Sequence, residues 1–561
     1  METADLLITG AQTLDVETGE LIDAPLAIAG DRILGFGDYP CAITLDLPGQ
    51  VLLPGFWDGH LHLESSMLLP GQFAAAAVPH GTVGVVADPH EIANVCGLSG
   101  ARYLLDNTPH ELLDVRVMAP SCVPATPFET AGAEITVADI AEMLKWPEVL
   151  GLGEVMNCPG VINRDPVMLA KLAAALGKPI DGHAPGLTGA ALEAYVAAGP
   201  ESDHEATTLE EGAEKLAAGM WLMIREGSAS RNLQALAPLL RGDKRDRCLL
   251  VSDDLDAHDL VHRGHLDYLL SQAVRLGVAP LDAVRGVSAN VAARFGLLGH
   301  GALAPGYVAD LAAVSDLASF KVNAVVKSGK LVVQNGKLLA PVQADSQALP
   351  CTCHVPNLDP DVFLVAAPDA AEQAQARVIV AFDGAIVTGS AEATLRVNGG
   401  CVLPDAAQDV LALAVLERHG RNGNVGRGFI RGFGLKAGAL ASTVAHDSHN
   451  LLVVGADAVS MATAARAVVA AGGGQAAAVG DKVLNLLPLP VAGLISTLSA
   501  AEVAQATREL EASARQLGCP LSHPFMTLSF MALPVIPELK LTDRGLFDVT
   551  RFEHISAVMQ L

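Results

Sequence analysis

The chain has 561 residues, of which 51% are hydrophobic, and carries a formal net charge of −26. Its length predicts several domains, and its apolar content is typical of a globular protein rather than a disordered one. The acidic charge argues against a nucleic-acid backbone or an anionic membrane as a partner, because both bind clustered Lys and Arg.

Three further features bear on where the protein works. The N-terminal stretch METADLLITG is acidic where a signal peptide needs basic residues. The nine cysteines are odd in number and mostly isolated, so we expect no disulfide framework. The longest uncharged span, residues 483–501, contains Asn485, Pro488 and Pro490, and we expect it to form buried core and turns rather than a membrane span. We predict a cytoplasmic protein that acts on a small molecule.

Short apolar runs separated by Gly turns fill residues 1–50, and the same texture returns in residues 301–345. Two distant segments of strand character on either side of a different middle predict one β-sandwich domain built from both.

The middle segment, residues 51–300, alternates apolar runs with helix-like stretches at 136–146, 165–177 and 208–219. We expect strands in VLLPGFWDGHLH, TVGVVADPHE, DVRVMAPSC, VLGLGEVMN, PIDGHAPG, SDHE, WLMIREG and CLLVSDD. Eight strands alternating with helices indicate a (β/α)₈ TIM-like barrel. After a linker at residues 345–363, the rest of residues 346–561 is long enough for a C-terminal α/β domain.

Nearly all of the eight predicted strands end in His, Asp or Glu. In a parallel barrel these ends share one face, which is where such barrels hold their active sites. The candidate metal ligands are His60, His62, Glu154, His183, His204 and Asp253. Four imidazoles and two carboxylates offer the nitrogen and oxygen ligands of two divalent ions, with Glu154 placed to bridge them.

This donor set predicts metal-assisted hydrolysis at a carbon, either of an amide-like bond or of an amino-substituted ring. We expect Asp253 to take the proton of the metal-activated hydroxide and pass it to the leaving group. His204 or a neighbouring carboxylate would polarise the substrate atom that gains negative charge.

Other polar residues are candidates for substrate binding or proton transfer, and each has an alternative interpretation. Asp88, His90 and Glu91 would bind a further metal, carry protons or form a turn cluster. Arg225, Glu226 and Ser228 would read the edge of a heterocycle or form an Arg–Glu ion pair. His446, Asp447 and His449 would cap the active site or only a helix or turn. Glu64 and Ser65 would line the substrate.

Several longer motifs resemble those of a known family. They are PGFWDGHLHLESSM, ADPHEIANV, PSCVPATPFETAGAE, LGLGEVMN, DGHAPGL, SDHE, MIREGS, GRGFIRGFGLKAGALASTVAHDSHNLLVVG and PFMTLSFMALPVIPELKLTDRGLFD. Through these motifs, the chain resembles the adenine deaminase family of the metal-dependent amidohydrolase superfamily. The resemblance covers nearly the whole chain.

The resemblance implies hydrolytic deamination of adenine to hypoxanthine and ammonia in purine salvage. It implies two divalent ions, Mn(II) or Fe(II) before Zn(II), held by the six ligands above, with Glu154 in place of the carboxylated lysine of many superfamily members. We also expect a homo-oligomer, a dimer. One departure is SDDLDAHDLVHRGH, where the family usually follows Asp-Asp with Arg or Lys and then Pro. A different aminopurine or a cyclic amide is therefore the alternative substrate.

Overall fold

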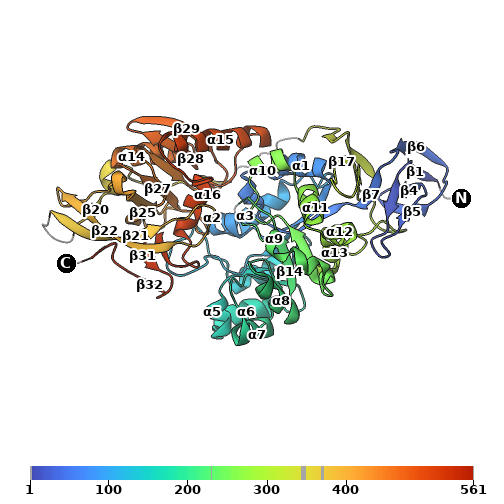
Figure 1. The fold of residues 1–561 in the computed structure, drawn as a ribbon, viewed down its shortest axis with the longest axis horizontal. Helices are drawn as coiled ribbons and strands as arrows, with labels where there is room; N and C mark the ends of the chain where they lie inside the picture. The colour runs from blue at the N-terminus through green and yellow to red at the C-terminus, as the bar shows by residue number, and fades with distance from the viewer. Residues whose placement is uncertain (1–2, 229, 343–348, 368–371, 560–561) are drawn as a thin grey trace. The chain divides into compact units, whose positions relative to one another are not determined.

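The computed structural model describes residues 3–228, 230–342, 349–367 and 372–559 (Figure 1). Two compact units make up the chain. The barrel unit comprises Met1–Pro89, Leu104–Ser121 and Thr136–Ser346, and the C-terminal unit comprises His90–Tyr103, Cys122–Ile135 and Gln347–Leu561. The start of the predicted linker, residues 345–348, lies outside the described residues.

The barrel unit contains the eight predicted parallel strands in chain order. They are β8 (Phe56–Leu61), β9 (Thr82–Ala87), β10 (Asp114–Ala119), β11 (Val149–Val155), β12 (Ile180–Gly182), β13 (Ser202–Asp203), β14 (Trp221–Arg225) and β15 (Cys248–Val251). Strands β8 to β12 form one hydrogen-bonded sheet and β13 to β15 another. A parallel bridge between Leu61 and Asp253 closes the ring from β15 back to β8. The predicted TIM-like barrel is confirmed.

Helices alternate with these strands along the chain. They are α1 (Pro70–Ala77), α4 (Val137–Met143), α5 (Cys158–Ile162), α6 (Pro166–Ala174), α7 (Gly189–Ala197), α8 (Leu209–Ala217), α9 (Leu233–Leu236), α10 (Ala257–Arg263), α11 (Leu266–Arg275), α12 (Pro280–Gly286) and α13 (Ala289–Phe295). The three predicted helices are α4, α6 and α8. Each helix is capped at its N-terminus by the side chain of the preceding residue, which accepts a backbone N–H of the first turn. The capping residues are Thr136, Asp165 and Thr208 respectively.

The first predicted strand is wrong in one respect, because the run that begins at Val51 forms two strands. Strand β7 (Val51–Pro54) pairs with a different sheet, and β8 starts the barrel. The break falls at Gly55, where an added Cβ would lie 2.5 Å from a Val83 methyl carbon. The missing side chain lets the backbone pass closely from one sheet to the other.

The predicted composite β-sandwich is also confirmed. One sheet has the order β5 (Arg32–Phe36), β4 (Leu26–Ala29), β1 (Ala4–Thr9) and β6 (Cys41–Asp46). The other has the order β19 (Lys337–Leu338), β18 (Lys330–Gln334), β17 (Val322–Lys327), β16 (Leu311–Val314), β7, β2 (Gln12–Leu14) and β3 (Leu21–Ile22). Antiparallel pairing of β7 with β16 joins the two chain segments, and their apolar side chains share one core.

The C-terminal unit is built on one large sheet. Its order is β20 (Val365–Ala366), β23 (Cys401–Val402), β22 (Gly389–Asn398), β21 (Gln373–Val380), β25 (Val425–Arg431), β24 (Leu411–Leu416), β27 (Leu451–Gly455), β26 (Ala439–Ser442), β28 (Gly474–Val479) and β29 (Lys482–Pro488), and β33 (Val558–Met559) pairs with β21. A small sheet joins β30 (Leu539–Thr542), β31 (Gly545–Asp548) and β32 (Glu553–His554).

Helices α2 (His90–Cys96), α14 (Ala458–Ala470), α15 (Ala500–Gln516) and α16 (Pro524–Ser529) complete this unit, and α3 (Leu98–Asp106) begins in it. The apolar side chains of α14 pack on β24, β26, β27 and β28. Across the described residues, no helix has both the length and the apolar character needed to cross a membrane.

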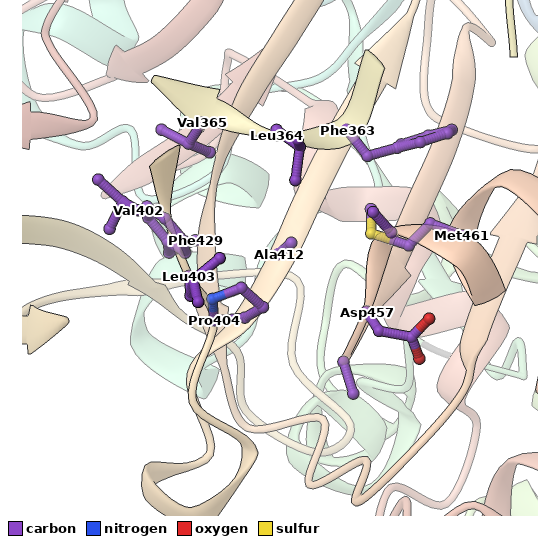
Figure 2. A pocket seen from close by; sticks show the side chains of 12 residues that line it. Phe363, Leu364, Val365, Val402, Leu403, Pro404, Ala412, Phe429, Asp457 and Met461 are labelled. Carbon is purple, nitrogen blue, oxygen red and sulfur yellow. The ribbon is translucent and has the colours of Figure 1, made fainter. Parts of the chain in front are cut away.

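A cavity of about 330 Å³ lies in the C-terminal unit, between β20, β23 and the start of α14 (Figure 2). Its lining is apolar apart from Asp457. The Asp457 carboxylate already accepts the backbone N–H and the hydroxyl of Ser460 and so caps α14. The lining of this cavity therefore contains no cluster of reactive groups.

One buried cation in the C-terminal unit stands out. The ammonium group of Lys540, in β30, is fully buried and donates to the carbonyl oxygens of Ile386 (2.8 Å) and Phe530 (2.9 Å). Burial lowers the pKa of Lys540 to about 7.

We predict that Lys540 makes the free energy of unfolding rise with pH above about pH 7. The folded protein releases this proton near pH 7, whereas an unfolded lysine keeps it to about pH 10.4. The unfolded state then binds more protons, which adds at most about 1.4 kcal/mol per pH unit. Urea unfolding of the native protein and of Lys540→Met near about pH 7.5 and 9.5 measures this, and equal pH slopes would contradict it.

Candidate metal centre and active site

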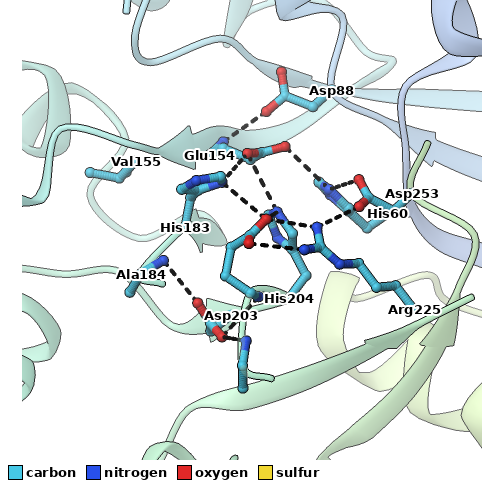
Figure 3. Close-up of polar contacts among 12 residues, drawn as sticks. His60, Asp88, Glu154, Val155, His183, Ala184, Asp203, His204, Arg225 and Asp253 are labelled. Atoms are coloured by element: carbon cyan, nitrogen blue, oxygen red, sulfur yellow. Dashed lines mark hydrogen bonds and ion pairs between the residues drawn. The ribbon is translucent and has the colours of Figure 1, made fainter. Parts of the chain in front are cut away.

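The structure brings the six predicted ligand residues together at the carboxyl ends of the barrel strands. Figure 3 shows five of them: His60, Glu154, His183, His204 and Asp253. His60 lies in β8 and Glu154 in β11, whereas the other four residues follow strand ends directly or within two positions. Five of the six are buried, and His183 is slightly exposed. The polar side chains that end these apolar strands therefore share one space.

Glu154 stands at the centre of this group. Its Oε1 atom lies 3.2 Å from His60 Nε2 and 3.0 Å from His62 Nε2. Its Oε2 atom lies 2.8 Å from His183 Nδ1 and 3.5 Å from His204 Nε2. One carboxylate is thus shared by two pairs of imidazoles, which is the arrangement expected of a ligand that bridges two ions.

Asp253 completes the side of the cluster that holds His60 and His62. Its Oδ1 atom lies 3.5 Å from His60 Nε2 and 3.2 Å from His62 Nε2. The backbone φ of Asp253 is 58°, in the left-handed region that aspartate tolerates better than most residues. This turn directs the carboxylate back over β8.

The buried carboxylates of the cluster favour the binding of positive charge. Burial opposes ionisation of Glu154, but the surrounding imidazoles hold the pKa of this carboxyl well below its usual range. Burial would lower the pKa of His60, but the Asp253 and Glu154 carboxylates raise it to about 10. The buried carboxylates therefore create a strongly negative potential among the imidazoles.

Supporting contacts orient the ligands. The Asp88 carbonyl oxygen lies 3.0 Å from His62 Nδ1, so this nitrogen carries the hydrogen and Nε2 turns toward Glu154. The Asp88 carboxylate accepts the backbone N–H of Glu154 at 2.7 Å. An added Cβ on Gly153 would lie 2.2 Å from this carboxylate, so glycine is needed there. Asp88 thus supports two of the ligands.

These residues fit two divalent cations. Ligand atoms in three triplets lie within 4.8 Å of one another: His60, His204 and Asp253; His60, His62 and Glu154; and Glu154, His183 and His204. Within the described chain, His60 Nε2 and Glu154 Oε1 are buried and make no hydrogen bond. Buried nitrogen and oxygen atoms left in this state are typical of metal ligands.

Arg225 neutralises part of this charge. Its Nη1 atom donates to Asp253 Oδ2 and to Glu205 Oε1, both at 2.6 Å, and Nη2 donates to Glu205 Oε2 at 2.9 Å. Glu205 also lies 3.3 Å from His204 Nε2. Burial opposes ionisation of Asp253, but Arg225 and the histidines hold the pKa of this carboxyl well below its usual range.

The other predicted residues of the barrel unit lie outside this cluster of close contacts. Ser65 donates to Asp254, and Glu64 is buried in the turn η1 (Leu63–Ser66). Ser228 donates to Asp259 at 2.8 Å, and Glu226 lies 4.0 Å from Arg231. Arg225 therefore forms an Arg–Glu ion pair with Glu205 and not with Glu226.

The remaining candidates lie in the C-terminal unit, where Glu91 meets His446 and His449. The Glu91 carboxylate makes short contacts with His446 Nδ1 and His449 Nε2, and His90 Nε2 lies 3.5 Å from it. His449 Nδ1 accepts the Ala445 N–H at 3.0 Å, so its hydrogen is on Nε2 and points at Glu91. Burial lowers the pKa of His449 to about 4 and keeps it neutral. The ligand atoms of Glu91, His446 and His449 also lie within 4.8 Å of one another, so the predicted further metal stays a prediction.

Two further carboxylates near these groups escaped sequence analysis. Glu205 follows His204 directly in SDHE, and its only signal was that position. Glu129, in PSCVPATPFETAGAE, is buried, and burial together with the Asp447 carboxylate raises its pKa well above the usual range. Asp447 is buried as well. The contacts of Glu205 and Glu129 depend on segments distant in sequence, so no local pattern marks them.

Comparison with known proteins gives similarity over the same regions. Residues 51–332 match the amidohydrolase family, and residues 385–553 match the adenine deaminase C-terminal domain. An adenine deaminase of Desulfatibacillum aliphaticivorans is 45% identical over 556 residues, covering 98% of this chain and 97% of that protein. One of Brucella suis biovar 1 is 43% identical over 555 residues, covering 99% and 94%.

Among solved structures, a β-aspartyl dipeptidase of Fervidobacterium islandicum AW-1 aligns with 61% of this chain and 99% of its own, at 15% identity and a TM-score of 0.46.

We predict that Arg225→Met destabilises the metal-free protein by about 3–5 kcal/mol, because it leaves two buried carboxylates without their counter-charge. Arg225→Lys should recover only part of this loss, because an ammonium group cannot reproduce the two-pronged contact with Glu205. Urea unfolding of the native protein and the two variants measures their order of stability. Native-like stability of the Met variant would show that the ion pairs contribute nothing.

Proposed function

We propose that this chain, which belongs to the adenine deaminase family of the amidohydrolases, hydrolyses adenine to hypoxanthine and ammonia. The similarity to adenine deaminases spans nearly the full length of both chains. The observation that carries the proposal within the site is the Glu154 carboxylate shared by two pairs of imidazoles. Such a site suits hydrolysis of an amino-substituted ring carbon.

We propose that His60, His62, Glu154, His183, His204 and Asp253 hold two divalent ions. The donors are nitrogen and carboxylate oxygen with no thiolate, a mixture that suits Mn(II) or Fe(II). Two ions bound here would supply the Lewis acidity that makes a water molecule a nucleophile at neutral pH. Glu154 would hold both, with one carboxylate oxygen toward each pair of histidines.

The two oxygens of Asp253 have separate tasks in this proposal. Arg225 holds Oδ2 at 2.6 Å and fixes the orientation of the carboxylate. Oδ1, which faces His60 and His62, accepts a proton from the attacking water and delivers it to the departing amino nitrogen. Water then contributes its oxygen to the ring carbon, and the amino group leaves as ammonia. His204 is placed to polarise the ring atom that gains charge.

Several features of its setting are part of the proposal. All nine cysteines are free thiols, which supports a role in the reducing cytoplasm, in purine salvage. We further propose a homodimer whose substrates are adenine and water, with no nucleic acid or membrane as partner. The domain boundaries at residues 50, 300 and 345 remain predictions.

We predict adenine deamination by the purified protein after removal of its metals and reloading with Mn(II) or Fe(II). Ammonia release from adenine, adenosine, guanine and cytosine should favour adenine, and elemental analysis should find about two ions per chain. Faster turnover of another aminopurine would support the alternative substrate. Absence of adenine turnover under every loading would refute the proposed function.

We predict that Asp253→Asn keeps bound metal but lowers kcat by about 10²–10⁴-fold, because the amide cannot accept the proton. Asparagine tolerates the left-handed backbone at this position, so the loss would not come from strain. Asp243→Asn, at an exposed position before β15, makes the same chemical change away from the site and serves as the control. Near-native kcat in Asp253→Asn would rule out the proton transfer.

A further inference from the structure

We propose that Asp203 and Lys215 form a positioning pair that sets the separation of His183 and His204, and thereby the affinity of the metal centre. This inference rests on the proposed function only in taking those histidines as metal ligands. It assigns a role to two buried residues that the reaction itself does not use.

The pair lies at a gap in the barrel. The described strands form two hydrogen-bonded sheets, one ending at β12 and the next beginning at β13, with no regular ladder between them. His183 directly follows β12, and His204 directly follows β13. One backbone hydrogen bond, from the Glu201 N–H to the Ile180 carbonyl at 2.9 Å, crosses the gap at the amino end of these strands. Because no ladder continues from it to the strand ends, main-chain hydrogen bonding holds the two ligands relative to each other less firmly than it would inside a sheet.

The Asp203 carboxylate ties both strand ends together, as Figure 3 shows for Ala184. Its Oδ1 accepts the N–H of Ala184, the residue after His183, at 2.8 Å. Its Oδ2 accepts the N–H groups of Glu205 and Ala206, which follow His204, at 3.0 and 2.9 Å. One side chain thus binds the backbone beside both ligands.

Lys215, in α8, binds this carboxylate. Its ammonium group donates to Asp203 Oδ2 at 2.8 Å, to the Ala184 carbonyl at 2.7 Å and to Glu211 Oε1 at 2.7 Å. These contacts use all three hydrogens of the ammonium group. Both Asp203 and Lys215 are fully buried, so water does not compete for the contacts.

Other side chains bridge the same gap. The Ser202 hydroxyl accepts the Gly182 N–H at 3.2 Å and donates to Asp181 at 2.7 Å. Arg294 donates to the Ile180 carbonyl and to Asp181. The gap is thus bridged largely by side chains, and Asp203 is the member nearest in sequence to a ligand.

Asp203→Asn is the decisive variant. Every neighbour of the carboxylate is a donor, so an asparagine NH₂ group must face either Ala184 or the Glu205–Ala206 backbone. The side chain keeps its size while its hydrogen-bond pattern fails. We expect Mn(II) to bind the metal-free variant about 10–100-fold more weakly than the native protein, the usual effect of losing a group that supports ligands. Lys215→Met should change the affinity in the same direction.

A matched control exists at the other end of the barrel. Lys327 makes a buried pair with Asp310 and also contacts Asp114, which begins β10 and so lies at the amino edge of the strands. Asp310→Asn breaks a comparable ion pair away from the ligands. We expect it to lower stability in urea but to leave Mn(II) affinity within about twofold of native.

Titration of the metal-free proteins with Mn(II), followed by the electron paramagnetic resonance signal of free Mn(II), gives the affinities, and urea unfolding gives the stabilities. Native affinity in Asp203→Asn, or equal weakening in Asp310→Asn, would overturn the positioning role. If Asp203→Asn does not fold, Ser202→Ala tests the same gap and should weaken binding severalfold, whereas unchanged affinity in that variant would refute the inference. A native protein that binds no Mn(II) would instead refute the proposed metal centre.

Discussion

The constraint on which the site depends is the closure of the barrel at two seams. The eight strands form one sheet of β8 to β12 and another of β13 to β15, so two neighbouring pairs lack a regular ladder. A buried aspartate occupies each seam. Asp203 binds the ends of β12 and β13, and Asp58, in β8, accepts the N–H groups of Ser252 and His60. This arrangement sets the positions of four candidate ligands, because His183 and His204 flank one seam and His60 and Asp253 flank the other.

Glu154 and Arg225 differ in how the charge of the buried carboxylates is compensated. Burying several carboxylates together is unfavourable unless cations or hydrogen bonds compensate them. Arg225 neutralises one side by contacting both Glu205 and Asp253, whereas Glu154 has only imidazoles around its two oxygens. The guanidinium of Arg225 therefore contacts Asp253 and Glu205 rather than Glu154, and negative charge remains where two divalent ions would bind.

Sequence patterns predicted the barrel, the composite sandwich and the grouping of six candidate ligand residues, because short apolar runs between turns or helices and polar strand ends are local signals. They did not predict which partner each supporting side chain would choose. Arg225 lies beside Glu226 in sequence but pairs with Glu205, 20 residues away, and Lys215 reaches back to Asp203 across a helix. The break at Gly55 was also hidden, since the clash that glycine avoids comes from Val83 on the next strand. Each of these choices depends on three-dimensional packing that no window of sequence contains.

Residues 88 to 91 show how closely two tasks can lie along one chain. Asp88 ends in the barrel unit and supports His62 and Glu154, while Glu91, three residues later, belongs to the C-terminal unit. There its buried carboxylate contacts the ring nitrogens of His446 and His449, which are more than 350 residues away in sequence. A second barrel connection enters the same unit, where Thr130 donates to Asp543. The C-terminal unit is thus completed by the chain that leaves β9 and β10. Without residues 347–561, Glu91 would lose the two imidazoles that hydrogen-bond its buried carboxylate, so the barrel sequence and the C-terminal sequence depend on each other for stability.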